Sequence, residues 1–133
     1  MAHTDTLAVT ALATGDNCTV IRVAGELDHN SEQLFLASTG SIAATGHPYL
    51  VLDVTALTFC DSRGLYSLLT LHWLLRRRDG ALLLAGVGQR LGELLHQTGS
   101  GTVLAGYPSV SKALAAVPNS YRPAWPPRPA TAD

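Results

Sequence analysis

The chain has 133 residues, 47% of them apolar and 14% charged, which suits one compact domain with an adequate core. A formal net charge of −1 and an isoelectric point near 6.5 exclude a strongly basic nucleic-acid-binding protein, because phosphate binding requires clustered Lys and Arg. The one basic cluster, Arg76-Arg77-Arg78, ends a predicted helix, where positive charge complements the helix dipole.

The termini and cysteines predict a cytoplasmic protein. Residues 1–5 lack the basic and apolar regions of a signal peptide. The longest apolar stretch, around residues 65–75, is too short to span a bilayer. Cys18 and Cys60 show neither metal-ligand nor CxxC spacing, so we expect reduced, partly buried thiols.

The first half of the chain predicts a hairpin, a helix and a buried strand. Gly15-Asp16-Asn17 has the composition of a turn between two strand-like runs. Ser31 is a suitable N-cap for the helix, and Gly46-His47-Pro48 ends it. The last run is almost continuously apolar, as expected of a central strand covered on both faces. In order, the elements are strands at 7–14 and 18–24, a polar loop at 25–30, a helix at 31–44 and a strand at 49–54.

The second half continues the alternation of helices and strands. Its first helix carries an apolar stripe and stops at Asp79-Gly80. That stripe consists of Leu65, Leu68, Leu69, His72 and Leu75. The elements are a helix at 65–78, a strand at 81–87, a helix at 89–97, a short strand at 102–105 and a helix at 109–116. Residues 118–133 are Pro-rich and nearly free of aliphatic side chains, which predicts a disordered tail after a domain of residues 1–117.

Strands that alternate with helices predict a single α/β domain with a small mixed, largely parallel sheet and right-handed crossovers. If the strands that end at Ala24 and Val54 are parallel, their carboxyl ends lie on one edge of the sheet. Such edges are where open α/β sheets bind ligands. The loop at 25–30 and the loop at Asp61-Ser62 are therefore predicted to form one surface.

Ser62 stands where a strand, a tight loop and a helix start meet. A hydroxyl there faces the unpaired N–H groups and the positive end of the helix dipole. A phosphate would be well tolerated at that position, and a docked protein would meet a new dianion. The position has the physical outline of a phosphoserine switch, although a serine at a helix start is also an ordinary N-cap.

Two segments carry a resemblance to a known family. Gly25-Glu26-Leu27-Asp28-His29 and Leu57-Thr58-Phe59-Cys60-Asp61-Ser62-Arg63-Gly64-Leu65 resemble the paired loops of STAS-domain anti-sigma factor antagonists. Gln89-Arg90-Leu91-Gly92-Glu93-Leu94-Leu95, followed by Thr98-Gly99, resembles that family's third helix and its glycine turn. The order of elements agrees over about residues 7–117.

The resemblance implies a non-enzymatic regulator without a cofactor. In relatives the unphosphorylated domain binds an anti-sigma factor that is also an ATPase-fold serine kinase, and a sigma factor is released. The kinase phosphorylates the serine that corresponds to Ser62, and a phosphatase reverses the modification. By position, Asp61 is the motif acid and could orient the serine, Asp28 contributes to docking, and Gly64 lets the partner approach closely. No direct nucleic-acid or membrane partner is implied.

Arg63 and Tyr66 depart from the family pattern, which usually has a small residue and a glycine at these positions. Arg63 could pair with a phosphate on Ser62 and weaken the switch, or it could contact an acid of the partner. Tyr66 enlarges the surface near the site. Both are predicted to contact the partner, and either could change the partner or reduce phosphorylation.

Other functions remain open at this level. A nucleotide- or metabolite-binding module could use the glycine-rich turn Gly86-Val87-Gly88-Gln89-Arg90-Leu91-Gly92, but that turn lies late in the chain and no acid follows about twenty residues on. A STAS interaction module that is not phosphorylated is another alternative. Ser62 has no G-x-S-x-G elbow, and the histidines and cysteines lack metal-site spacing.

Overall fold

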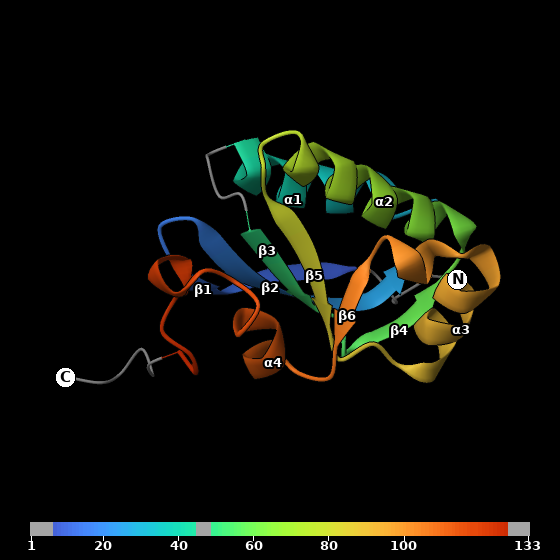
Figure 1. The fold of residues 1–133 in the computed structure, drawn as a ribbon. Coiled ribbons are helices and arrows are strands. Elements are labelled where there is room, and N and C mark those ends of the chain that lie inside the picture. Colours follow the sequence, from blue (N-terminus) through green and yellow to red (C-terminus); the bar gives the residue numbers. More distant parts are fainter. Residues whose placement is uncertain (1–6, 45–48, 128–133) are drawn as a thin grey trace.

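The computed structural model describes residues 7–44 and 49–127, and it confirms a mixed α/β domain with an N-terminal hairpin (Figure 1). The strands are β1 (Ala8–Thr14), β2 (Cys18–Leu27), β3 (Tyr49–Asp53), β4 (Leu57–Cys60), β5 (Ala81–Ala85) and β6 (Ala105–Tyr107). The helices are α1 (Glu32–Ala44), α2 (Ser62–Arg76), α3 (Gln89–Thr98) and α4 (Val110–Leu114), with 3-10 turns at Ser100–Thr102 and Asn119–Tyr121. The predicted helix end at 46–48 lies outside the described residues.

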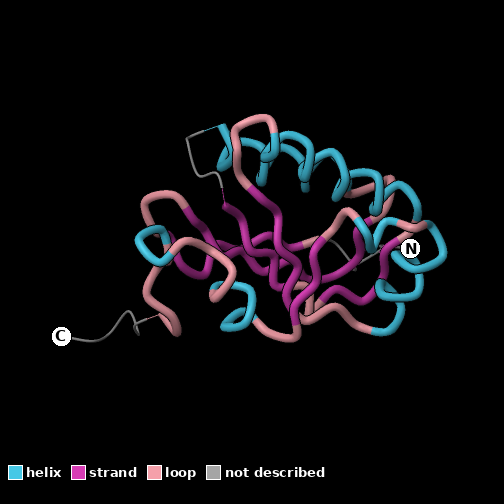
Figure 2. Tube along the Cα trace, in the orientation of Figure 1, coloured by secondary structure: helices cyan, strands magenta, loops and turns pink. Residues whose placement is uncertain are grey.

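The sheet is largely parallel, as expected. Its strand order is β1-β2-β3-β5-β6, and β4 pairs with β2 beside that path. β1 and β2 form the antiparallel hairpin, whereas the β2–β3, β3–β5 and β5–β6 pairs are parallel. Figure 2 shows the strands as one twisted layer between helices. The carboxyl ends of β2 and β3 therefore lie at the same edge, as predicted.

Two hydrophobic clusters cover the two faces of the sheet. Alternate residues of one strand enter different clusters, as the pleat requires: Leu50 and Leu52 join the first, and Val51 joins the second. α1 and α2 lie side by side on the first face, and α4 covers the second (Figure 1). On α2 the buried leucines are Leu65, Leu68, Leu71 and Leu75, so Leu71 takes the core position that the predicted stripe assigned to Leu69 and His72.

The strand β4 was not predicted. It has only four residues, Leu57–Cys60, and its burial is intermediate or low throughout, so it is too short to give a clear periodic pattern. It forms because residues 25–27 extend β2 beyond its pairing with β3 and offer a free edge. The predicted strand at 102–105 is also displaced, since Ser100–Thr102 is a 3-10 turn and β6 begins at Ala105.

The chain after Val117 lies against the domain as far as the structure describes it. The rings of Tyr49 and Tyr121 are 5.7 Å apart, and Trp125 also packs against the second cluster. Arg122 donates from Nε to the Val117 carbonyl at 2.8 Å and from Nη2 to the Ala115 carbonyl at 3.1 Å. Residues 118–127 thus show specific contacts, which a disordered tail would lack; the boundary at residue 117 stays a prediction. Within 7–44 and 49–127, no helix is long and apolar enough to cross a membrane.

Candidate functional site

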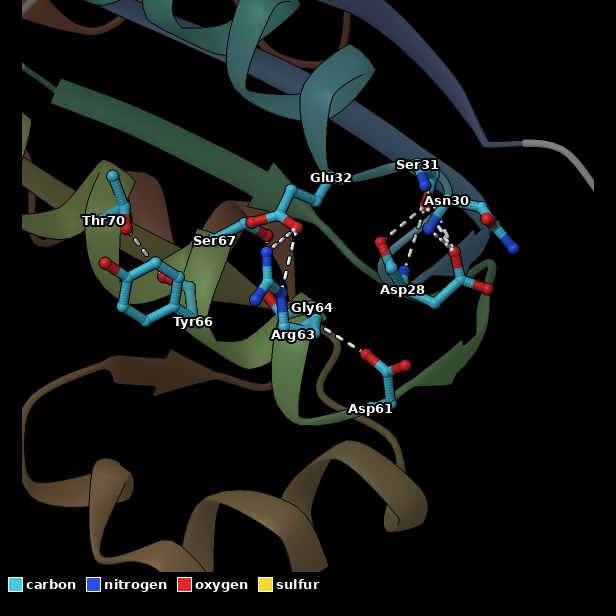
Figure 3. A network of polar contacts seen from close by, with 10 residues as sticks. All are labelled: Asp28, Asn30, Ser31, Glu32, Asp61, Arg63, Gly64, Tyr66, Ser67 and Thr70. Atoms are coloured by element: carbon cyan, nitrogen blue, oxygen red, sulfur yellow. Dashed lines mark hydrogen bonds and ion pairs between the residues drawn. The ribbon is translucent and has the colours of Figure 1, made fainter.

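The pairing of β4 with β2 joins the two predicted loops. Leu27 pairs with Cys60 at the end of the ladder, and the Leu27 carbonyl accepts the N–H of Asp61 at 3.3 Å. Farther back, the Thr58 hydroxyl donates to the Gly25 carbonyl at 3.0 Å. The residues that follow, Asp28 on one side and Asp61-Ser62 on the other, therefore leave the sheet at the same place. In Figure 3 the side chains of Asp28 and Asp61 lie on the same side of the α2 start.

Asp61, and not Ser62, is the N-cap of α2. Its Oδ1 accepts the N–H of Gly64 at 2.9 Å, and its backbone is extended, which is the usual geometry of an N-cap. Ser62 is the first residue of the helix and is exposed. Within the described residues its hydroxyl has no hydrogen-bond partner, so the alternative of Ser62 as a capping residue does not hold. The hydroxyl is accessible and structurally uncommitted.

Asp28 forms a turn within its own loop. Its Oδ1 accepts the N–H of Asn30 at 3.0 Å, the N–H of Ser31 at 3.2 Å and the hydroxyl of Ser31 at 3.2 Å. The buried Ser31 hydroxyl also donates to the Glu26 carbonyl at 2.7 Å. This network holds the loop rigid just before α1 (Figure 3). Asp28 therefore has a structural role, and its contribution to docking stays a prediction.

Arg63 is paired with Glu32, a residue that no sequence motif pointed to. Arg63 donates from Nε and Nη2 to Glu32 Oε1, at 3.1 and 2.8 Å. The Glu32 side chain is only 12% exposed, whereas that of Arg63 is 62% exposed. The hydrogen bond and the charge of Glu32 raise the pKa of Arg63. In the sequence, Glu32 is recognisable only as an acid in the first turn of α1. Its partner Arg63 lies 31 residues away and could not be predicted from that position.

Gly64 lies in the first turn of α2 and is buried. A Cβ at this position would clash with the Leu27 carbonyl and would lie 2.9 Å from the Cys60 Sγ. Gly64 therefore has an internal reason to lack a side chain, which is the packing of α2 on the end of β2. The predicted close approach of a partner at this residue stays a prediction.

Aromatic side chains extend the exposed surface beyond Ser62. Tyr66 is 61% exposed, and Trp73, seven residues farther along α2, is 55% exposed; this spacing places both on one side of the helix. Phe59 of β4 is also exposed, just before the cap. Phe35 of the core is fully buried, whereas these three rings are exposed. Exposed aromatic side chains are enriched in protein–protein interfaces.

Two hollows flank the start of α2. One, of about 540 Å³, lies between the Asp28 loop and Arg63 and is lined by His29, Asn30, Glu32, Gln33, Leu36 and Arg63. The other, of about 490 Å³, lies between Phe59-Cys60 and α3. Burial, and then the charge of Asp61, raise the pKa of Cys60 to about 12, so this thiol is protonated and a poor nucleophile at neutral pH. No group of metal-binding side chains occurs within the described ranges.

The glycine-rich turn before α3 also has internal reasons for its composition. Gly86 has a φ of +75°, and a Cβ there would clash with the Thr55 Cγ2. Gly88 is the N-cap of α3 without a side-chain cap bond. The turn thus shows packing and helix-start functions, and a nucleotide at this position stays an untested alternative.

Comparison with known proteins agrees with this fold. The model of the STAS domain family matches residues 10–113. An anti-sigma factor antagonist from Mycobacterium paratuberculosis superposes with a TM-score of 0.77 and 26% sequence identity, over 88% of this chain and 98% of that chain. The Bacillus cell fate determinant SpoIIAA in its phosphorylated form gives 0.66 and 20%, over 84% and 100%. The murine Slc26a9 anion transporter gives 0.66 and 15%, over 83% of this chain and 22% of that chain. The last two likenesses, which are the more distant in sequence, show the fold alone.

Proposed function

Because this chain belongs to the STAS domain family, we propose that it is an anti-sigma factor antagonist that phosphorylation of Ser62 switches off. The unphosphorylated form binds an anti-sigma factor that is also an ATPase-fold serine kinase, and a sigma factor is set free. A phosphatase that acts on phospho-Ser62 restores the active form. The protein works in the cytoplasm as a binding module and catalyses no reaction itself.

The accessible Ser62 hydroxyl at the start of α2 is the observation that carries the proposal. Ser62 is exposed, its neighbour Asp61 already caps the helix, and the Asp28 loop lies beside it. A kinase can therefore reach the hydroxyl without unfolding the helix start. Exposed aromatic rings on both sides, Tyr66 and Phe59, provide contact area for a docked partner.

The chemistry of transfer is simple at this position. The Ser62 oxygen attacks the γ-phosphorus of ATP held by the kinase, the bond to ADP breaks, and the hydroxyl proton passes to a base. Asp61 Oδ1 is engaged with the Gly64 N–H, so the carboxylate would orient the loop at least as much as it would accept the proton. The N–H groups of the first turn then stabilise the phosphate.

Phosphorylation would weaken docking through charge and hydration. Phosphoserine adds about −1.5 to −2 charge, here next to Asp61 and at the strand end where Asp28 also leaves the sheet. A partner that covers this surface would have to remove water from a dianion in an acidic environment. Changing an interaction from mostly bound to mostly free takes about 5 kcal/mol of differential affinity, which a desolvated dianion can supply.

The test begins with the partner. The full chain is used to capture proteins from native lysate, and any ATPase-fold kinase is then purified and incubated with the chain and ATP. We expect the addition of one phosphate, located at Ser62 by fragmentation, and none on Ser62→Ala. Binding to the purified partner should survive in Ser62→Ala and be lost in Ser62→Asp.

The matched control is Ser41→Asp, the same chemical change at an exposed serine of α1, which should bind like the wild type. Equal binding by Ser62→Ala and Ser62→Asp, or phosphate that never appears on Ser62, would show that there is no switch. An interaction module that is not phosphorylated would give that result and would still lose binding on Tyr66→Ala.

A further inference from the structure

We propose that Glu32 is a positioning residue that holds Arg63 away from Ser62, so that a phosphate on Ser62 keeps its full charge. This inference rests on the proposed phosphorylation of Ser62 and names a regulatory feature of the same site. Without Glu32, the guanidinium that follows the acceptor serine would offset about one unit of the negative charge of the phosphate.

The contact between Glu32 and Arg63 is well built for this role. One carboxylate oxygen accepts both Nε and Nη2, at 3.1 and 2.8 Å, and charge-assisted bonds of this kind are stronger than neutral ones. The Glu32 side chain is 12% exposed, so loss of its partner would leave a largely buried carboxylate unpaired. Release of Arg63 from Glu32 is therefore unfavourable.

The competing contact is close at hand. Ser62 and Arg63 are consecutive, with Cα atoms about 3.8 Å apart, and arginine readily forms two parallel bonds to a phosphate. Neighbouring side chains of a helix point about 100° apart. Arg63 extends to Glu32 on α1 (Figure 3), so its guanidinium is engaged with that carboxylate while the pair lasts. A free Arg63 could fold back to the phosphate.

The consequence is the amount of negative charge that a partner meets. With Arg63 held by Glu32, the phosphate adds to Asp61 and Asp28, and the surface becomes strongly acidic. With Arg63 on the phosphate, about one unit of the roughly 1.5 to 2 units of added negative charge is offset, and phosphorylation would weaken docking less. The pair formed by Glu32 and Arg63 thus makes an arginine next to the acceptor compatible with a switch.

The test uses the full chain with phosphoserine inserted at position 62 during translation, so no kinase is required. A ³¹P NMR titration measures the second pKa of the phosphate, which is near 6 for free phosphoserine. We expect the otherwise wild-type protein to match, to within about 0.2 unit, the double variant Glu32→Gln/Arg63→Ala, in which both charges are absent. In Arg63→Ala alone the value should rise, because the Glu32 carboxylate is then unpaired. In Glu32→Gln the value should fall by at least about half a unit, because the freed guanidinium favours the dianion.

The double variant Glu32→Gln/Arg63→Ala separates this effect from the mere loss of the Glu32 charge. Its pKa should lie clearly above that of Glu32→Gln. Asp28, His29 and Asp61 are present in all four proteins, so their influence cancels, and thermal melts confirm that each variant is folded. A clearly lower pKa in the wild-type background than in the double variant would overturn the inference, as would equal values in Glu32→Gln and the double variant. Absence of phosphate on Ser62 in cells would contradict the proposed function and leave this titration unchanged.

Discussion

The main chain of Gly64 packs directly on the carbonyl of Leu27, with no room for a Cβ between them. The same carbonyl accepts the N–H of Asp61. The carbonyl group of Leu27 at the end of β2 therefore fixes the position of the first turn of α2 relative to the sheet. Through this contact Ser62, on the helix, is held beside the loop of Asp28, on the strand.

Replacing Gly64 with alanine should destabilise the protein by about 1–3 kcal/mol, because overpacking against backbone cannot be relieved by a rotamer change. Urea unfolding monitored by circular dichroism measures the effect. Gly40 is the matched control, since a Cβ there meets nothing within 4 Å and the residue lies within α1. Gly40→Ala should raise stability by about 0.5–1 kcal/mol. A Gly64→Ala protein as stable as the wild type would disprove the close contact.

Two contributions of Asp61 should be separable by substitution: its hydrogen bond as the N-cap of α2 and its negative charge. Asp61→Ala removes the acceptor for the Gly64 N–H and should lower the free energy of unfolding by about 0.5–2 kcal/mol, whereas Asp61→Asn retains a cap of similar quality. Thermal unfolding of both variants measures the difference. If Asp61→Asn is stable yet binds the partner more weakly, the charge itself contributes to docking; if both variants melt alike, Asp61 is not the cap.

Gly86 and Gly99 share a φ of +75° but differ in their surroundings. Gly99→Ala should cost about 1–2 kcal/mol through the left-handed backbone alone. Gly86→Ala should cost more, since its Cβ would also displace the Thr55 side chain. Denaturant midpoints of the two variants provide the comparison, and in Gly86→Ala/Thr55→Ser part of the extra loss should return. Equal losses in both single variants would contradict the contact with Thr55.

Truncation after Val117 should weaken the domain. Tyr121 and Trp125 lie against the second hydrophobic cluster, and their partial burial corresponds to about 1–3 kcal/mol. Unfolding of residues 1–117 is compared with that of residues 1–127, and the second form is expected to match the full chain. In the Trp73→Phe background, Trp125 is the remaining tryptophan, and its emission should shift to the red on unfolding. Equal stability of the two truncated forms would instead support the predicted boundary at residue 117.

The thiol of Cys60 should make stability fall at alkaline pH. Its pKa in the folded protein is raised to about 12 from 9.0 by burial and by the charge of Asp61. Below pH 9 both states keep the proton, so the contribution is fully present; as the pH rises through 9 toward 12, only the unfolded state loses it, and stability declines. Between about pH 8 and 10 the loss should reach up to about 1 kcal/mol, measured by urea unfolding. Cys60→Ala should show a flatter pH dependence, and an unchanged slope would refute the shift.

Much of the architecture follows from local patterns. The turn at Gly15-Asp16-Asn17, the buried strand at residues 49–54 and the helix that ends at Gly99 are each encoded within a few neighbouring residues. The parallel arrangement of β2 and β3 follows from the alternation of strands and helices. That alternation is enough to predict that Asp28 and Ser62 share one edge of the sheet.

Other features exist only in the folded chain. β4 has only four residues and forms because the end of β2 offers an edge. The bond between Glu32 and Arg63 joins residues 31 positions apart, and the lack of a side chain at Gly64 is explained by Leu27, far away in sequence. Periodicity reports which face of an element is buried, because burial repeats along the chain. Pairwise contacts between distant residues leave no such repeat. The sequence by itself therefore indicated that the loops of Asp28 and Ser62 share one surface. The tertiary structure decided which groups on that surface are paired and which, like the Ser62 hydroxyl, have no partner within the described residues.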